Sequence, residues 1–169
     1  MRTTFFLRKS YSTSWQDHKI KKKMIKENIQ DLSAFGGVPI FIILIVISII
    51  LKEFTLTKQL ILGIILSYIL IFGIRSFYFK TRPDKTKYKN YFEKVDASSF
   101  PSAHTMRSVI LVIILRNFMQ DNLVFILLIL ISLGVSISRV YLKRHFLSDV
   151  IGGLILGIIS GISIIKYIS

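Results

Sequence analysis

The 169-residue chain contains no cysteine and only nine acidic residues, against 23 lysines and arginines. The absence of cysteine excludes disulfide bonds, thiolate metal sites and cysteine nucleophiles. The shortage of carboxylates argues against a two-metal hydrolytic centre, which needs several of them close together. No Asp-x-Asp pair occurs in the sequence. We therefore expect neither a metal ion nor another cofactor.

Long hydrophobic runs dominate the rest of the sequence, in which 52% of the residues are hydrophobic. Four uncharged runs, and a fifth that contains Arg107, are long enough or nearly long enough to cross a bilayer. They cover Leu32–Leu51, Gln59–Ile74, Ala97–Leu115, Asn122–Ser138 and Val150–Ile165. Gly153, Gly157 and Gly161 recur along the last run at a spacing that permits close helix packing. The sequence predicts an all-α, integral-membrane helical bundle of about five transmembrane helices.

Positive charge is concentrated in two segments and gives a formal net charge of +14. One segment is the N-terminal stretch Met1–Gln30, and the other is the loop Arg75–Lys94 between the second and third runs. Such patches attract lipid phosphates, phosphorylated substrates or nucleic acid. No recognised nucleic-acid-binding motif accompanies the charge, so we do not expect nucleic acid as a partner.

The distribution of charge and hydrophobicity divides the chain into two parts. We expect residues 1–30 to form a basic interfacial helix on the membrane surface, with a solvated, partly disordered tail as the alternative. Residues 31–169 would form a membrane-embedded domain. Alternation of the spans then puts the N-terminus, the loop Arg75–Phe100 and the segment Arg139–His145 on one side of the membrane. The polar residues that could carry chemistry therefore meet at one surface.

Three polar clusters stand on that side, each beside a hydrophobic run. They are Arg75 with Arg82-Pro83, then Pro101-Ser102-Ala103-His104, then Ser138-Arg139 with His145 and Asp149. Ionisable groups at this depth are costly and are usually functional. On a helix, His145 and Asp149 would share a face, so that the carboxylate could hold the imidazole N–H.

The clusters together suit the binding of a phosphoryl group. The three arginines supply cations, and Pro101 suits the first turn of a helix whose free N–H groups would face an anion. Catalysis of phosphoryl transfer consists mostly of positioning and charge stabilisation, which such groups provide.

The order and spacing of the clusters resemble the signature of the type 2 phosphatidic acid phosphatase superfamily, over about Asp31 to the C-terminus. That signature is Lys-x6-Arg-Pro, then Pro-Ser-Gly-His, then Ser-Arg-x5-His-x3-Asp. The chain departs from it at Arg75, which replaces lysine, and at Ala103, which replaces glycine. Many relatives have six spans, and we expect the basic N-terminal segment to stand here in place of the first.

The resemblance implies a membrane lipid phosphatase that works without a metal ion. In such an enzyme His145 attacks phosphorus to form a phosphohistidine, Asp149 orients the imidazole, and His104 protonates the leaving oxygen and later activates water. The phosphate-binding residues would be Arg75, Arg82, Ser102, Ala103 and Arg139. The implied substrate is a lipid phosphate monoester or diphosphate, such as phosphatidate, phosphatidylglycerophosphate, a polyprenyl phosphate or a prenylated phosphosugar.

The sequence alone leaves two alternatives to hydrolysis open. One is a lipid phosphotransferase that uses the same phosphohistidine, and the other is an inactive lipid-binding relative, which the presence of both histidines and Asp149 disfavours. The excess of Lys and Arg beside the site favours a cytoplasmic site by the positive-inside rule, whereas relatives commonly place it on the outer face. Nothing in the sequence fixes an oligomeric state.

Two further interpretations concern basic residues near the clusters. Arg107 either supports the phosphate site, pairs with a loop acid such as Asp96, or reaches interfacial water. The loop lysines are interpreted as a solvated rim that attracts anions, namely Lys80, Lys85, Lys87 and Lys89.

Overall fold

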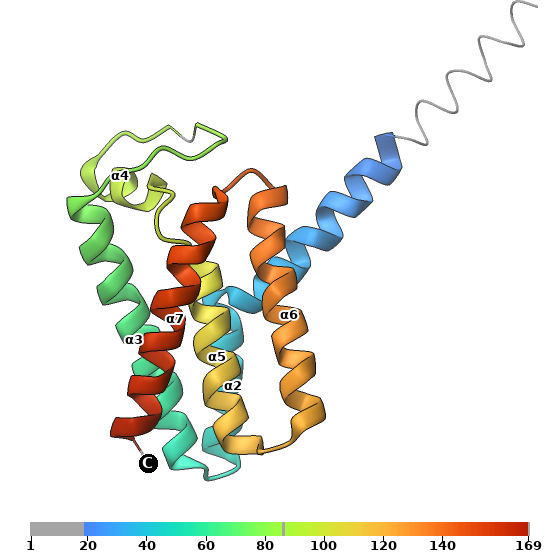
Figure 1. Ribbon diagram of the computed structural model, residues 1–169, viewed down its shortest axis with the longest axis vertical. Coiled ribbons are helices and arrows are strands. Elements are labelled where there is room, and N and C mark those ends of the chain that lie inside the picture. Colours follow the sequence, from blue (N-terminus) through green and yellow to red (C-terminus); the bar gives the residue numbers. More distant parts are fainter. Residues whose placement is uncertain (1–18, 86, 169) are drawn as a thin grey trace, which may run out of the picture.

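The computed structural model describes residues 19–85 and 87–168, and all regular structure in these ranges is helical, as predicted. An N-terminal helix over residues 19–33 runs into a short 3-10 helix, η1. The elements that follow are η1 (Ala34–Gly36), α2 (Val38–Ile50), α3 (Phe54–Phe77), α4 (Tyr91–Ala97), α5 (Ala103–Met119), α6 (Asn122–Tyr141) and α7 (Leu147–Tyr167). Figure 1 shows the long helices side by side in a bundle, from which the N-terminal helix projects.

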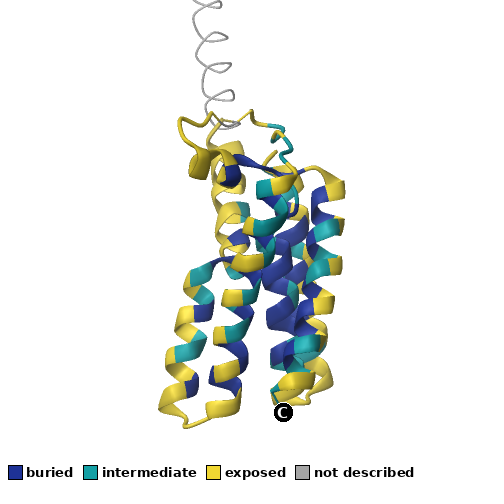
Figure 2. Cartoon of the chain, turned by 90° about the vertical axis from the view of Figure 1, so that its left-hand side faces the viewer, coloured by how far each residue is buried: buried dark blue, intermediate teal, exposed yellow. Residues whose placement is uncertain are grey.

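Helix α5 is central to the bundle and packs against α7, α6, α3 and η1. The core at its surface consists of fully buried side chains, which include Phe41, Leu60, Met106, Ile110 and Ile114. The outer faces of the helices are also apolar, and many of their isoleucines and leucines are more than half exposed (Figure 2). Extended apolar surface of this kind faces lipid in a membrane protein.

Three helices of the described chain are long and apolar enough to cross a membrane, namely α3, α6 and α7. A fourth crossing results if the N-terminal helix with η1 and α2 is one broken span, bent by 50°. The helical bundle is thus confirmed, whereas the number of five spans stays a prediction, because α5 has only 17 residues.

The first predicted span, Leu32–Leu51, is not continuous. Gly37 adopts an extended conformation, with φ −86° and ψ 162°, and α2 begins directly after it. Pro39 lies in the first turn of α2, where its missing N–H costs no helical hydrogen bond. The Gly36-Gly37 pair and this proline therefore end one helix and start the next.

The predicted close packing along the glycines of the last run is confirmed. A Cβ atom at Gly153 would lie 2.5 Å from the Ser102 carbonyl oxygen, and one at Gly157 would lie 2.8 Å from the Met106 carbonyl oxygen. Helices α5 and α7 therefore approach backbone to backbone. As a result, the start of α7 lies beside the start of α5, where two of the polar clusters occur.

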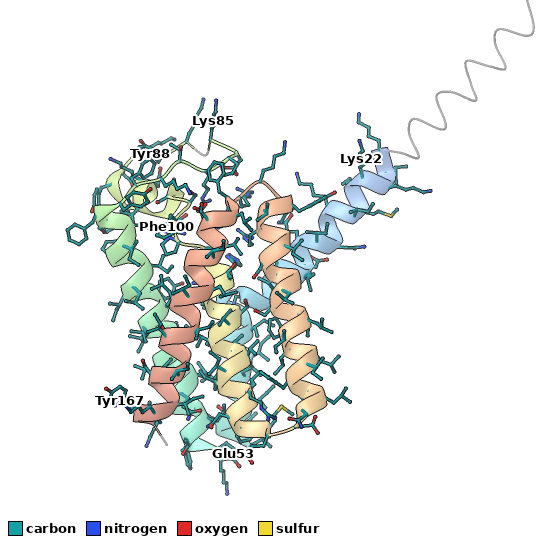
Figure 3. All side chains as sticks on the ribbon, viewed as in Figure 1. Lys22, Glu53, Lys85, Tyr88, Phe100 and Tyr167 are labelled. Atoms are coloured by element: carbon teal, nitrogen blue, oxygen red, sulfur yellow. The ribbon has the colours of Figure 1, made fainter. Side chains whose placement is uncertain are left out.

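The N-terminal helix leaves the bundle on the side of the long loop. Figure 3 shows Lys22 on this helix and Lys85 on the loop at one end of the molecule, with Glu53 and Tyr167 at the opposite end. Residues 1–18 of the predicted interfacial segment lie outside the described residues. The described part exposes Ile20, Met24 and Ile25.

Candidate active site

The structure brings the three polar clusters together at one end of the bundle. A cavity of about 420 Å³ is lined by Arg75 from the end of α3, Arg82 from the following loop, Arg139 from the end of α6, and both His104 and His145. Ala103 also lines it, whereas Ser102 and Asp149 are fully buried behind its wall. Arg107, from the second turn of α5, completes the polar lining.

The three arginines are held by hydrogen bonds to the end of α4, to the loop before α5 and to Ser33, which precedes η1. Arg75, only 5% exposed, donates from Nη1 to the Asp96 carbonyl oxygen at 3.1 Å and from Nη2 to that of Pro101 at 3.0 Å. Arg82 donates to the same Asp96 carbonyl oxygen, and Arg139 donates from Nη1 to Ser33 Oγ at 2.9 Å. Loop and helix ends thus fix the guanidinium groups before any ligand binds.

Each of these three arginines keeps a donor without an acceptor. Within the described part of the chain, the Nε atoms of Arg75, Arg82 and Arg139 are buried and form no hydrogen bond. Burial lowers the pKa of Arg82, against the carboxylates of Asp96 and Asp84, which raise it. A bound anion would satisfy the donors and offset the burial of the charges, so the cavity fits an oxyanion such as phosphate.

His145 is positioned by a carbonyl group rather than by the carboxylate. Its Nδ1 atom lies 2.6 Å from the Ser99 carbonyl oxygen, and Asp149 Oδ2 is 4.0 Å away. The prediction that His145 and Asp149 lie on one helix is wrong, because α7 begins at Leu147 and His145 belongs to the preceding turn. At this distance Asp149 forms no hydrogen bond with the imidazole, so the role predicted for it in orienting His145 stays a prediction.

The carbonyl contact fixes the chemistry of the imidazole ring. To donate to Ser99, Nδ1 carries the proton, which leaves the lone pair on Nε2. Burial lowers the pKa of His145 to about 3, and the nearby charge of Arg139 acts in the same direction. Because the ring is only 3% exposed and neutral at physiological pH, Nε2 is available as a nucleophile.

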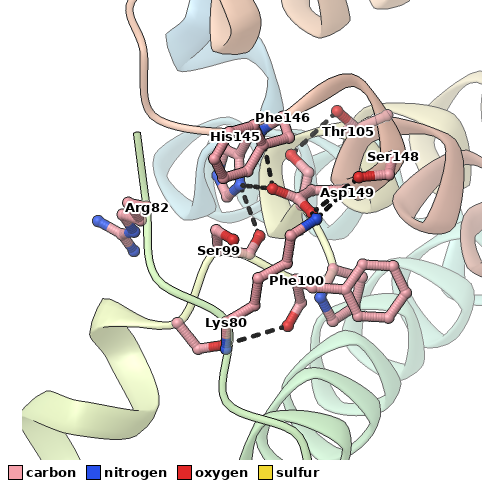
Figure 4. Close-up of polar contacts among 12 residues, drawn as sticks. Lys80, Arg82, Ser99, Phe100, Thr105, His145, Phe146, Ser148 and Asp149 are labelled. Carbon is pink, nitrogen blue, oxygen red and sulfur yellow. Dashed lines mark hydrogen bonds and ion pairs between the residues drawn. The ribbon is translucent and has the colours of Figure 1, made fainter. Parts of the chain in front are cut away.

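Asp149 caps its own helix and pairs with a loop lysine. Its Oδ2 accepts the Phe146 N–H at 2.8 Å, and its Oδ1 lies 2.6 Å from Lys80 Nζ, which also donates to Ser148 Oγ at 2.8 Å (Figure 4). The interpretation of Lys80 as a solvated rim residue is therefore wrong. A usable signal was the spacing of Lys80 and Arg82, since alternate residues of an extended chain point to the same side.

The start of α5 differs from the predicted arrangement. Pro101 precedes the N-cap residue Ser102 and is not part of the helix. The Ser102 N–H donates to the Asp149 carbonyl oxygen at 2.9 Å, and its Oγ accepts from Thr105 Oγ1 at 3.1 Å. The N–H groups of Ala103 and His104, in the first turn, remain for an anion at the helix N-terminus.

The described residues contain no group of three or more His, Asp or Glu side chains that could hold a metal ion. Asp149 is engaged by Lys80 and by its own helix. Asp96, which lies 3.9 Å from Arg75 Nη1, is 87% exposed. Absence of a metal requirement stays a prediction.

Comparison with known proteins identifies the family of this fold. The family model described as the PAP2 superfamily matches residues 56–169, which contain all three polar clusters. The chain belongs to the PAP2 superfamily. With the apolar helices of its bundle, it is a multi-pass membrane protein.

Two solved structures share this PAP2 fold. LpxE of Aquifex aeolicus superposes with a TM-score of 0.71 at 23% identity, over 85% of this chain and 87% of that one. The first transmembrane PAP2 type phosphatidylglycerolphosphate phosphatase from Bacillus subtilis gives a TM-score of 0.65 at 22% identity, over 92% and 86% of the two chains.

Among curated proteins, phosphatidylglycerophosphatase B of Bacillus subtilis (strain 168) is 37% identical over 70 residues. The match covers 36% of this chain and 34% of that relative, so it spans about a third of the relative's length.

Proposed function

We propose that this protein is a membrane lipid phosphatase that passes a phosphoryl group from a lipid phosphate to His145 and then to water. The observation that carries the proposal is the buried, neutral His145, whose Nδ1 is held at 2.6 Å by the Ser99 carbonyl group in a cavity lined by four arginines and a second histidine. The names of the PAP2 relatives, which include a phosphatidylglycerophosphatase, support a lipid phosphate as substrate.

In the first step Nε2 of His145 attacks phosphorus, the N–P bond forms, and the P–O bond to the lipid breaks. His104, which lines the same cavity, gives its proton to the leaving oxygen. The negative charge of the bound phosphate favours the protonated form of His104 before this transfer. Arg75, Arg82 and Arg139 stabilise the oxygens of the phosphoryl group as it moves.

In the second step His104 takes a proton from water, which attacks the phosphohistidine. The N–P bond breaks, inorganic phosphate leaves, and Nε2 regains its lone pair. The arginine cluster supplies the positive charge that a metal ion provides in other phosphatases, so we propose that the reaction is independent of metal ions.

The lipid tail is accommodated by the apolar wall of the cavity. That wall consists of Tyr68, Ile71, Phe72, Phe92 and Val95 from α3 and α4. Tyr68, Phe72 and Phe92 are also 53%, 46% and 73% exposed on the outer surface. A substrate whose tail stays in the bilayer can therefore reach the arginines from the lipid-facing side.

We also propose that the N-terminal helix lies on the membrane surface and attracts anionic lipid. Its described residues combine the exposed side chains Ile20, Met24 and Ile25 with five lysines. This mixture of apolar and basic residues is typical of interfacial helices.

The test is release of labelled phosphate from phosphatidate, phosphatidylglycerophosphate and polyprenyl phosphates by the purified chain in detergent with EDTA. We expect turnover, inhibition by vanadate and an acid-labile phosphoenzyme, all three absent in His145→Gln. Loss of turnover in EDTA that magnesium restores would contradict the metal-free mechanism. Transfer of the label to a second lipid would identify a phosphotransferase.

A further inference from the structure

Arg107 is a buried cation of the reaction cavity that the steps above do not use. It is 7% exposed, and its Nε donates to the Gly36 carbonyl oxygen at 3.0 Å. Its guanidinium carbon lies 5.7 Å from the centre of the Tyr68 ring. The side chain thus points into the bundle, so it does not reach out to interfacial water.

Arg107 lies on the membrane side of the phosphate-binding arginines. Tyr68, over which its guanidinium stacks, precedes Arg75 by seven residues on α3, which corresponds to about 10 Å along the helix axis. Tyr68, Ile71 and Phe72 form the apolar wall at the same depth. Arg107 is therefore next to the path by which a lipid tail approaches.

Arg107 forms no ion pair with a carboxylate among the described residues, and Asp96 acts on it only at longer range. Across the described residues, no Asp or Glu oxygen lies within ion-pair distance of it, and its only hydrogen bond uses Nε. Neither Nη group forms a hydrogen bond with a described residue, and the side chain lines the cavity. A buried charge of this kind is costly unless a partner compensates it.

The geometry points to a second anionic subsite, in which Arg107 binds a further phosphate of the substrate. We infer that the preferred lipid carries a phosphate between the reacting phosphate and the tail. This inference rests on the proposed function, because it assumes that the reacting phosphate binds at His145. A directly linked diphosphate and a glycerol-spaced phosphodiester share the required chemistry.

With a diphosphate substrate, the first step transfers the terminal phosphoryl group to His145. Nε2 of His145 bonds to the terminal phosphorus, and the P–O bond that joins the two phosphates breaks. The lipid monophosphate leaves with the proton from His104. Arg107 would hold the charge that remains on this leaving group, which a lipid monophosphate substrate lacks.

The experiment compares matched substrate pairs with the full chain in detergent micelles. One pair is farnesyl diphosphate and farnesyl phosphate, and the other is phosphatidylglycerophosphate and phosphatidate. The variants are Arg107→Met and Arg107→Lys, with Arg116→Met as the control. Arg116 is a suitable control because it lies on the same helix, outside the cavity, and stacks over Phe125 at 5.1 Å.

We expect Arg107→Met to lower kcat/KM about ten- to hundredfold for the substrate with a second phosphate, as for loss of a charge-assisted hydrogen bond. The matching monophosphate should change less than about threefold, and Arg107→Lys should recover part of the preference. Whichever pair shows the effect identifies the spacing of the two phosphates.

Equal losses with both members of each pair would overturn the inference, because they would show that Arg107 acts only through its bond to Gly36. Unchanged activity with all four substrates would overturn it as well. If the unmodified protein released phosphate from none of them, the proposed function itself would fail. A failure of the Arg107 subsite can therefore be distinguished from a failure of the proposed phosphatase function.

Discussion

Replacing Lys80 with methionine should destabilise the protein through Asp149. Lys80 Nζ lies 2.6 Å from a carboxylate that is fully buried, while the lysine side chain is 26% exposed. Removing one partner of a buried ion pair costs about 3–5 kcal/mol. Because solvent screens the lysine in part, we expect Lys80→Met to lower the free energy of unfolding by about 2 kcal/mol.

A double-mutant cycle isolates this pair. In Asp149→Asn the lysine can turn toward water, so adding Lys80→Met to it should cost little more. The expected coupling energy is about 1–2 kcal/mol, above the limit of about 0.5 kcal/mol within which independent sites add. Thermal unfolding in detergent, followed by circular dichroism, gives the stabilities. Lys87→Met is the control, because Lys87 is an exposed lysine of the same loop.

If Lys80→Met behaved like Lys87→Met, or if the coupling energy were below about 0.5 kcal/mol, the ion pair would not contribute to the folded state. Restoration of stability by Lys80→Arg, which keeps the charge, would show that the charge and not the packing of the stem is what matters.

Three further predictions concern the arginine cluster, the helix interface and pH. Arg75→Lys should lower kcat/KM about tenfold, because lysine keeps the charge but cannot bridge two carbonyl groups, whereas Arg75→Ala should be far worse; equal rates for the two variants would contradict this. Gly157→Ala should lower the free energy of unfolding by about 1–3 kcal/mol, because the new Cβ atom would crowd α5. Gly73→Ala should not, because a Cβ atom there has no neighbour within 4 Å. The pKa of His145 is lowered to about 3 in the folded state, so the unfolded state binds more protons between about pH 3 and its ordinary value near 6.5. Stability should therefore fall as the pH is lowered through this window, and it should fall less in His145→Gln.

The general position of the site could be predicted from the sequence, because two independent patterns agree on it. Alternation of the hydrophobic runs puts Arg75, His104 and Arg139 on one side, and the order of the three clusters resembles one family. The periodicity of apolar side chains and the length of a hydrophobic run are local properties, so both can be read from a single sequence. The cavity that these residues line shows that the two patterns describe one place.

The partners within the site could not be predicted, because distant segments provide them. Ser99, which holds His145, is 46 residues away in the chain, and no spacing rule connects the two. Lys80 differs from the other loop lysines because its backbone pairs with Ser98 and Ser99, which brings its side chain to α7. The start of α7 depends on the turn that contains Lys143, whose φ of 55° is left-handed and which no turn signal marks.

These tertiary contacts decide how much positive charge the cavity offers. Asp149 is buried 4.0 Å from His145, and alone it would cancel part of the field of the arginines. Lys80 Nζ, 2.6 Å from Asp149 Oδ1, balances this negative charge, while the carboxylate still caps α7. Arg75, Arg82 and Arg139 then line the cavity with less opposing charge from Asp149, while the Ser99 carbonyl group sets the tautomer of His145 without adding a negative charge. In the reaction proposed above, the group that orients His145 would therefore not weaken the attraction of the cavity for a negatively charged phosphate.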